Sequence, residues 1–253
     1  MAINVNTVYT TVLSILNKEQ RGYITPDEFN KIATQVQLNV FEKFFEDYNQ
    51  YLRMPKTDVE FASRIDHIRE EFQVFEKNES ASAVNGNVYT QPEDLNRFGS
   101  AFYEVGLNTP ELELVSKREY HQQKLSPLTQ PSSNFPIAIY QEDKLTVYPE
   151  VANPSVNDIG FNYIRKPKDV RWGYTTGVLG QYVYDATTYD PPNYPVPGVN
   201  ELTAGSTNFE ISESQQTEVV LEILQYSGVV IRDPQIIQAA SQELAQEEAN
   251  SKR

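Results

Sequence analysis

The chain has 253 residues, of which 39% are hydrophobic and 22% charged, a composition typical of a globular protein with one sizeable core or two modest ones. Because it contains no cysteine, disulfides, thiolate nucleophiles and thiolate metal ligands are excluded. The formal net charge of -14 at pH 7 repels phosphate backbones, so sequence-specific DNA binding is not expected. The sequence has no apolar run of about 18 residues, so no membrane-spanning segment is predicted. Its N-terminus lacks a basic start and a cleavage site, so no signal peptide is predicted.

Hydrophobic residues at steps of three and four predict helices in the first third of the chain. The first spans residues 5–17. The second begins at Thr25-Pro26-Asp27-Glu28, where a capping hydroxyl, a proline at the first helical position and first-turn carboxylates coincide. Met54-Pro55 is predicted to end it, and a third helix is expected over residues 61–75.

The second predicted helix carries two apolar faces, so two partners are needed to cover it. One interpretation buries both faces inside the chain's own bundle. The other leaves one face, with Phe41 and Phe45, for a second copy of the protein.

Short alternating segments after Lys77 predict β structure. Asn85-Gly86 is a strong hairpin signal, because both residues tolerate positive φ. A short helix is expected between Glu111 and Leu125, followed by a second hairpin. The expected strands of this hairpin and of the following region cover residues 137–140, 145–148, 159–165, 170–174 and 180–184, and together they suggest a small antiparallel sandwich or barrel.

Residues 185–205 hold a proline- and tyrosine-rich stretch that is expected to be an extended arm or a plain connecting loop. Two helices close the chain. The first is capped near Ser212 and expected to end at Gly228, and the second starts at Asp233-Pro234. Since the last helix has only a narrow apolar stripe, it should need to dock on another surface.

These elements predict an α+β fold. Its expected parts are an N-terminal helical bundle over residues 1–77, a β-rich domain with hairpins and the arm over residues 78–205, and C-terminal helices over residues 206–253.

The segment NKEQRGYITPDEF imitates a calcium-binding EF-hand loop, with Gly22 at the sixth position and Glu28 at the twelfth. However, Arg21 occupies the fifth position, where an oxygen ligand is needed, and a cation offers none. A capping box also explains Glu28. A calcium-binding module therefore stays an alternative, and no cofactor or metal is expected.

The sequence offers few signs of zinc binding, catalysis or nucleic-acid binding. The chain has only His67 and His121, without zinc-ligand spacing, and it lacks the GxSxG, Walker and GxGxxG motifs. Acidic residues in turns leave a glycan hydrolase as an alternative. The basic and aromatic residues of 163–174 favour an amphipathic strand pair over a single-strand nucleic-acid platform. We therefore expect no enzymatic activity.

Several segments together resemble one family: NKEQRGYITPDEFN followed by VFEKFFEDYNQYL, the block LVSKREYHQQKLSPLTQPSSNFPIAIYQEDKLTVYPE, FNYIRKPKDVRWGY, and QAASQELAQEE. The chain resembles the head-to-tail connector, or ring adaptor, of short-tailed, crAss-like bacteriophages. The resemblance covers nearly the whole chain in the same order.

This resemblance implies a virion structural protein, assembled in the host cytoplasm, that forms a ring of about twelve copies. The ring would sit between the portal and other tail ring proteins and let double-stranded DNA pass without specific binding. The implied portal-docking residues are Ile236, Ile237, Ala240 and Leu244. The loop with Tyr189 and Tyr194, together with Phe41 and Phe45, would contact a neighbouring subunit or the next ring.

Overall fold

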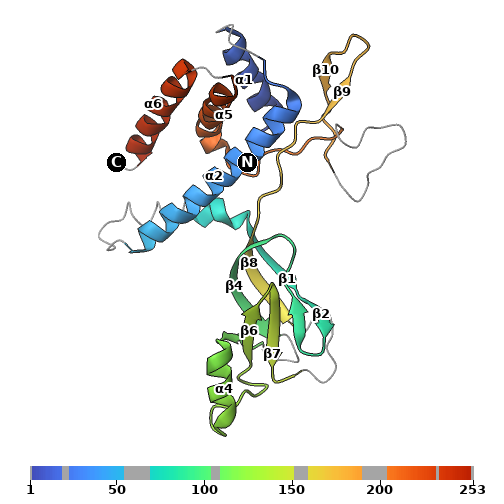
Figure 1. Ribbon diagram of the computed structural model, residues 1–253, viewed down its shortest axis with the longest axis vertical. Helices are drawn as coiled ribbons and strands as arrows, with labels where there is room; N and C mark the ends of the chain where they lie inside the picture. The colour runs from blue at the N-terminus through green and yellow to red at the C-terminus, as the bar shows by residue number, and fades with distance from the viewer. Residues whose placement is uncertain are drawn as a thin grey trace. The chain divides into compact units, whose positions relative to one another are not determined.

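The computed structural model (Figure 1) describes residues 2–18, 23–53, 69–103, 109–150, 159–189, 204–231 and 234–251. The described chain contains N-terminal helices, central strands and C-terminal helices, which confirms the predicted α+β class. It divides into two compact units. Unit 1 comprises residues 1–71 and 167–253, and unit 2 comprises residues 72–166.

These units differ from the expected ranges 1–77, 78–205 and 206–253, because both ends of the chain contribute to unit 1. Phe209 N–H donates to Ile3 O at 3.2 Å, and Ile3 N–H donates to Ile211 O at 3.3 Å. The backbone that precedes the first helix is thus bonded to the backbone that precedes the C-terminal helices.

Unit 1 is built from the helices α1 (Val5–Lys18), α2 (Pro26–Arg53), α5 (Gln216–Ile231) and α6 (Pro234–Ser251), with a short 3-10 turn, η2 (Glu213–Gln215), before α5. Helix α5 contacts α1, α2 and α6. The apolar stripes of the helices meet in one core, which includes Val8, Val12, Phe29, Val36 and Ile223. Burial of these stripes stabilises helices that propensity alone would leave marginal.

The helix starts follow from their capping residues. Asn4 Oδ1 accepts hydrogen bonds from the N–H groups of Asn6 at 2.9 Å and Thr7 at 3.2 Å, and so caps α1. The prediction that the helix after Ser212 ends at Gly228 is wrong, because α5 continues through Gly228 to Ile231. Glycine costs about 1 kcal/mol inside a helix but does not forbid helical geometry.

Unit 2 contains a three-stranded sheet and a five-stranded sheet. The first has the order β1 (Glu76–Ser80), β8 (Ile159–Arg165), β4 (Leu95–Tyr103). The second has the order β2 (Ser82–Asn85), β3 (Val88–Thr90), β7 (Lys144–Tyr148), β6 (Ile137–Gln141), β5 (Glu113–Leu114), and helix α4 (Lys117–Leu125) follows β5. All strand pairs in both sheets are antiparallel except β5–β6, which is parallel.

The two sheets share one core. Ala101 and Phe161 from the three-stranded sheet pack with Tyr89, Leu145 and Val147 from the five-stranded sheet, as in a small sandwich. Both predicted hairpins are present, β2–β3 and β6–β7. Gly86 has φ +56 in the first, the conformation for which the Asn-Gly signal selects.

Candidate assembly surface

Polar side chains on one face of α2 bind the backbone of an extended segment, residues 168–172. Asn30 Oδ1 accepts from Trp172 N–H at 2.7 Å, and Asn30 Nδ2 donates to Trp172 O at 3.3 Å. Thr34 Oγ1 accepts from Val170 N–H at 3.1 Å, and Gln37 Nε2 donates to Lys168 O at 2.6 Å. Since helix steps of four and three match alternate residues of an extended chain, the helix replaces a neighbouring strand.

This arrangement corrects the predicted strand over residues 170–174. The backbone of Arg171 pairs with Thr207 in an isolated β-bridge, and strand β9 begins at Tyr174. The alternation that suggested a strand instead places Val170 and Trp172 in the core of unit 1.

Trp172 is the centre of an aromatic group at the base of the β9–β10 hairpin. Its ring centroid lies 4.2 Å from that of Tyr9, and it stacks with Tyr174 at 5.8 Å and Tyr184 at 5.7 Å. Its Nε1–H donates to Asn6 Oδ1 at 3.1 Å. The two tyrosines belong to β9 (Tyr174–Thr176) and β10 (Tyr182–Tyr184), so the indole anchors both strands.

Backbone contacts fix the same base. Gly173 N–H donates to Ser206 Oγ at 2.9 Å, and Asp185 N–H donates to Gly173 O at 2.9 Å. A Cβ atom on Gly173 would lie 2.2 Å from Gly205 O, so only glycine fits there. Asp185 in turn accepts from Gly205 N–H at 3.0 Å through its carboxylate. Although burial favours a higher pKa for Asp185, hydrogen bonds from the backbones of Gly205 and Thr187 lower it.

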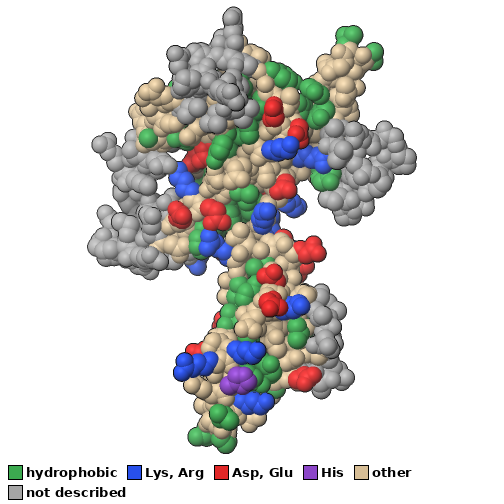
Figure 2. Space-filling view, in the orientation of Figure 1, with side chains coloured by type: hydrophobic (Ala, Val, Ile, Leu, Met, Phe, Trp, Pro, Cys, Tyr) green, Lys and Arg blue, Asp and Glu red, His purple; other side chains and the backbone are tan. Residues whose placement is uncertain are grey.

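The tip of this hairpin presents two hydrophobic side chains to solvent. Gly180 N–H donates to Gly177 O at 2.9 Å, closing a turn with Val178 and Leu179 at its centre. Val178 is 104% exposed and Leu179 is 91% exposed, and Figure 2 shows hydrophobic side chains at the end of this projection. Central turn positions usually carry polar residues or glycine. We call residues 173–184 the uncharged hairpin, because they contain no Asp, Glu, Lys or Arg.

Unit 2 carries a second exposed hydrophobic group, which follows α4. Helix α4 has a complete capping box, in which Glu119 N–H donates to Ser116 Oγ and Ser116 N–H donates to Glu119 Oε2. Leu125, the last residue of α4, is 86% exposed, and beyond the helix Leu128 is 96% and Phe135 77% exposed. Large apolar side chains gathered on one segment indicate a contact surface more strongly than isolated ones do.

Of the residues expected to contact a neighbouring subunit, those that the structure describes are buried to different extents. Phe41 has no exposed surface and Phe45 is half-buried, so the chain itself covers the first and part of the second. Tyr189 is half-buried, and the Arg171 guanidinium lies 4.1 Å from its ring centroid. Its N–H also donates to Ser206 O at 3.0 Å. Tyr194 lies outside the described residues.

The expected portal-docking stripe lies on α6, which packs against α5. Ala240 is 5% exposed and Leu244 is half-buried. Ile236 and Ile237 lie in the first turn of α6, and their side chains are outside the described part of the structure. Ala240 is thus covered by the chain itself, because α5 offers a nearby apolar surface, and it does not present a free docking surface.

The EF-hand-like segment places Glu28 in a capping box. Thr25 N–H and Oγ1 donate to Glu28 Oε2 at 2.9 Å and 2.7 Å, and Glu28 N–H donates to Thr25 Oγ1 at 3.3 Å. The bond from the Thr25 backbone is the main reason why the pKa of Glu28 is lowered. Residues 19–22 lie outside the described chain. Among described residues there is no group of three or more metal-binding side chains.

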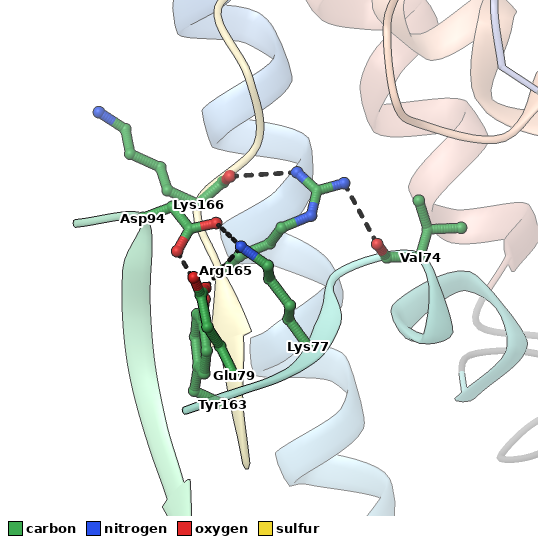
Figure 3. A network of polar contacts seen from close by, with 7 residues as sticks. All are labelled: Val74, Lys77, Glu79, Asp94, Tyr163, Arg165 and Lys166. Carbon is green, nitrogen blue, oxygen red and sulfur yellow. Dashed lines mark hydrogen bonds and ion pairs between the residues drawn. The ribbon is translucent and has the colours of Figure 1, made fainter. Parts of the chain in front are cut away.

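A polar network joins the strands at one end of the three-stranded sheet in unit 2 (Figure 3). Tyr163 Oη lies 2.6 Å from Asp94 Oδ1 and 2.9 Å from Glu79 Oε2, while Lys77 Nζ lies 2.7 Å from Glu79 and 3.1 Å from Asp94. Hydrogen bonds from Lys77 and Tyr163 lower the pKa of Glu79, and burial raises that of Tyr163. The single ammonium lies between two carboxylates and offsets part of their mutual repulsion, as in a structural clamp.

Comparison with models of protein families and with curated proteins gives no match for this chain. No helix in the described part of the chain is both long and apolar enough to cross a membrane.

Sequence patterns did not predict the exposed hydrophobic side chains of Val178, Leu179, Leu128 and Phe135. The signal for the first two was present, since an apolar pair lies between Gly177 and Gly180 in a stretch without charge. The polar face of α2 was also missed, because its partner segment is more than a hundred residues away, as in the separation of 142 between Asn30 and Trp172.

Proposed function

We propose that the protein is a virion structural protein, a subunit of a ring that connects the phage portal to the tail and forms part of the DNA channel. The observation that carries this proposal is the uncharged hairpin. Its base is fixed by Trp172, Gly173 and Ser206, and its tip exposes Val178 and Leu179 almost completely. A rigid projection with an apolar tip suits docking on a neighbouring subunit, because little conformational entropy is lost on binding.

The hydrophobic group after α4 supports the same proposal. A ring subunit contacts several partners at once, and each contact needs an apolar surface that the isolated chain leaves open. The hairpin tip belongs to unit 1 and the group of Leu125, Leu128 and Phe135 belongs to unit 2. Each unit therefore offers one such surface.

The charge of the chain fits a channel that DNA passes without being held. A net charge of -14 per subunit disfavours the release of counterions that drives tight binding to DNA. We propose that the ring leaves the passing duplex free to slide.

Electron microscopy of the intact particle at side-chain resolution tests the location. The proposal expects density for this chain as a closed ring between portal and tail, with Val178 and Leu179 covered by another subunit. Absence of the chain from purified particles, established by mass spectrometry of their proteins, would refute the proposal.

A further inference from the structure

Residues 110–114 leave one sheet of unit 2 and join the other. They begin on the edge of β4, where Tyr103 N–H donates to Pro110 O at 2.9 Å and Leu112 N–H donates to Ala101 O at 2.8 Å. At the next residue the chain pairs with β6, with Glu113 opposite Ile137. The segment therefore pairs with the edge of β4 at residues 101–103 and leaves the edge open at residues 98–100. A strand that passes from one sheet of a sandwich to the other leaves an edge in this way.

The uncovered part of the edge lacks the next pair of hydrogen bonds. In an antiparallel ladder that continued from Leu112, the N–H of Leu114 would donate to the carbonyl oxygen of Gly99. In the described chain β4 and β5 end two different sheets and no ladder joins them. Glu113 N–H and Val115 N–H donate to Pro136 O and Ala138 O. Because backbone groups alternate along a strand, Leu114 N–H points away from β6.

A groove of about 390 Å³ lies where this pairing stops, between residues 98–100 and residues 111–114. Both of its walls are sheet edges, and edge strands present N–H and C=O groups that accept another strand. Gly99 is exposed and is the extra residue of a β-bulge opposite β8, so no side chain from it enters the groove. The shape and the backbone groups favour an extended polypeptide.

The side chains around the groove alternate between apolar and acidic. Leu114 is 45% exposed and Phe98 is half-buried, so both offer apolar contact. Glu111 and Glu113 are both exposed, and both line the groove. A strand in this groove would face both carboxylates with its own alternate residues, and opposite charges across strands are stabilising.

We propose that this groove binds an extended segment of a different protein by strand addition, and that the segment alternates basic and apolar residues. A second copy of this chain is disfavoured as the source, because it carries a net charge of -14 and the strands of its uncharged hairpin contain no Lys or Arg. At about 3.3 Å per residue, the walls match a strand of about four residues. The inference goes beyond ring formation and does not rest on it.

The experiment titrates the full chain with the synthetic peptide acetyl-KVKVKV-amide and follows backbone amides by NMR. The proposal expects saturable shifts at Ser100 and Leu114. Since a cationic peptide can bind an acidic protein non-specifically, two peptide controls are needed. EVEVEV reverses the charge, and KPKVKV keeps all three lysines but removes a backbone donor. Both should bind at least about tenfold more weakly.

Variants of the chain separate charge from backbone pairing. Glu111→Lys with Glu113→Lys should weaken binding about tenfold, whereas the matched pair Glu76→Lys with Glu93→Lys, which has the same charge change outside the groove, should not. Leu114→Pro removes the N–H that faces the groove but spares the donors to β6. Equal binding of all three peptides, equal weakening by both Lys pairs, or shifts spread over the acidic surface would overturn the proposal. Shifts at the groove residues caused by added unlabelled copies of the chain itself would also overturn it.

Discussion

Asn30 holds Trp172 by both polar groups of its backbone, with Oδ1 2.7 Å from Trp172 N and Nδ2 3.3 Å from Trp172 O. One amide side chain on a helix thus does what the backbone of an adjacent strand would do. The same tryptophan stacks on Tyr174 and Tyr184 of the uncharged hairpin. The orientation of the hairpin therefore depends on a polar residue of α2.

Asn30→Ala should lower the free energy of unfolding by about 2 kcal/mol, because it leaves two part-buried backbone groups of Trp172 without partners. Urea unfolding of the full chain measures the change. The control is Gln35→Ala, at an exposed position of the same helix, and it should cost less than about 0.5 kcal/mol. If both variants lose the same free energy of unfolding, the two hydrogen bonds between Asn30 and Trp172 contribute no stability of their own.

Thr25→Ala should lower the free energy of unfolding by about 1 kcal/mol, since it removes the hydroxyl that caps α2.

Calcium should leave the Tm unchanged, because Glu28 already accepts hydrogen bonds from Thr25 through Oε2. Calorimetry with calcium checks this, with Glu46→Gln as the control for Glu28→Gln. Saturable micromolar binding that Glu28→Gln abolishes and Glu46→Gln preserves would restore the EF-hand hypothesis.

Lys77→Met should destabilise the protein at neutral pH and make its stability depend less on pH in the acidic range. Hydrogen bonds from Lys77 and Tyr163 lower the pKa of Glu79 in the folded state. Its ionised form therefore contributes stability above its unfolded pKa of about 4.3, and this contribution is lost as the pH falls through the lower folded pKa. Without Lys77 the folded pKa rises toward the unfolded value, so less stability is lost when the pH falls.

The loss of stability for Lys77→Met near pH 7 should be about 1 kcal/mol or less, because Lys77 is 41% exposed and solvent screens the pair. Urea unfolding at about pH 7 and about pH 4 measures both effects. Lys144→Met, at an exposed position of β7, should show neither. A pH dependence identical to that of the unaltered chain would contradict the clamp assigned to Lys77.

Val178→Ser with Leu179→Ser should weaken assembly of the protein without lowering its stability, because both side chains are almost fully exposed in the single chain. Sedimentation of the two-residue variant measures its oligomeric state. Ile15→Ser with Val74→Ser, which also removes two exposed hydrophobic side chains, should assemble normally. Unchanged assembly of the hairpin variant would remove the hairpin tip from the interface.

Local signals explain which parts of the fold could be predicted. The start of α2 and the Asn85-Gly86 hairpin depend on residues within one turn of each other, and both predictions were confirmed. The strand expected over residues 170–174 was wrong, because the partners of that segment are Asn30, Thr34 and Gln37 on a remote helix. In the sequence these three residues look like the solvent-facing side of α2.

The candidate surfaces were harder to predict, because they depend on exposure and register. The narrow stripe on α6 predicted that this helix docks on another surface, and α6 packs against α5 with Ala240 covered, but no pattern in the sequence named α5 as that surface. The groove beside β4 depends on where residues 110–114 leave one sheet for another. Strand β5 has only two residues, too short for a hydrophobic pattern to reveal it.

The mass of the assembled protein tests the central proposal most directly. Native mass spectrometry of the full chain, alone and mixed with portal protein, should detect one closed oligomer of fixed copy number, and the hairpin-tip variant should lose it. Monomers of 28.9 kDa under both conditions would contradict the proposal that this protein forms a ring.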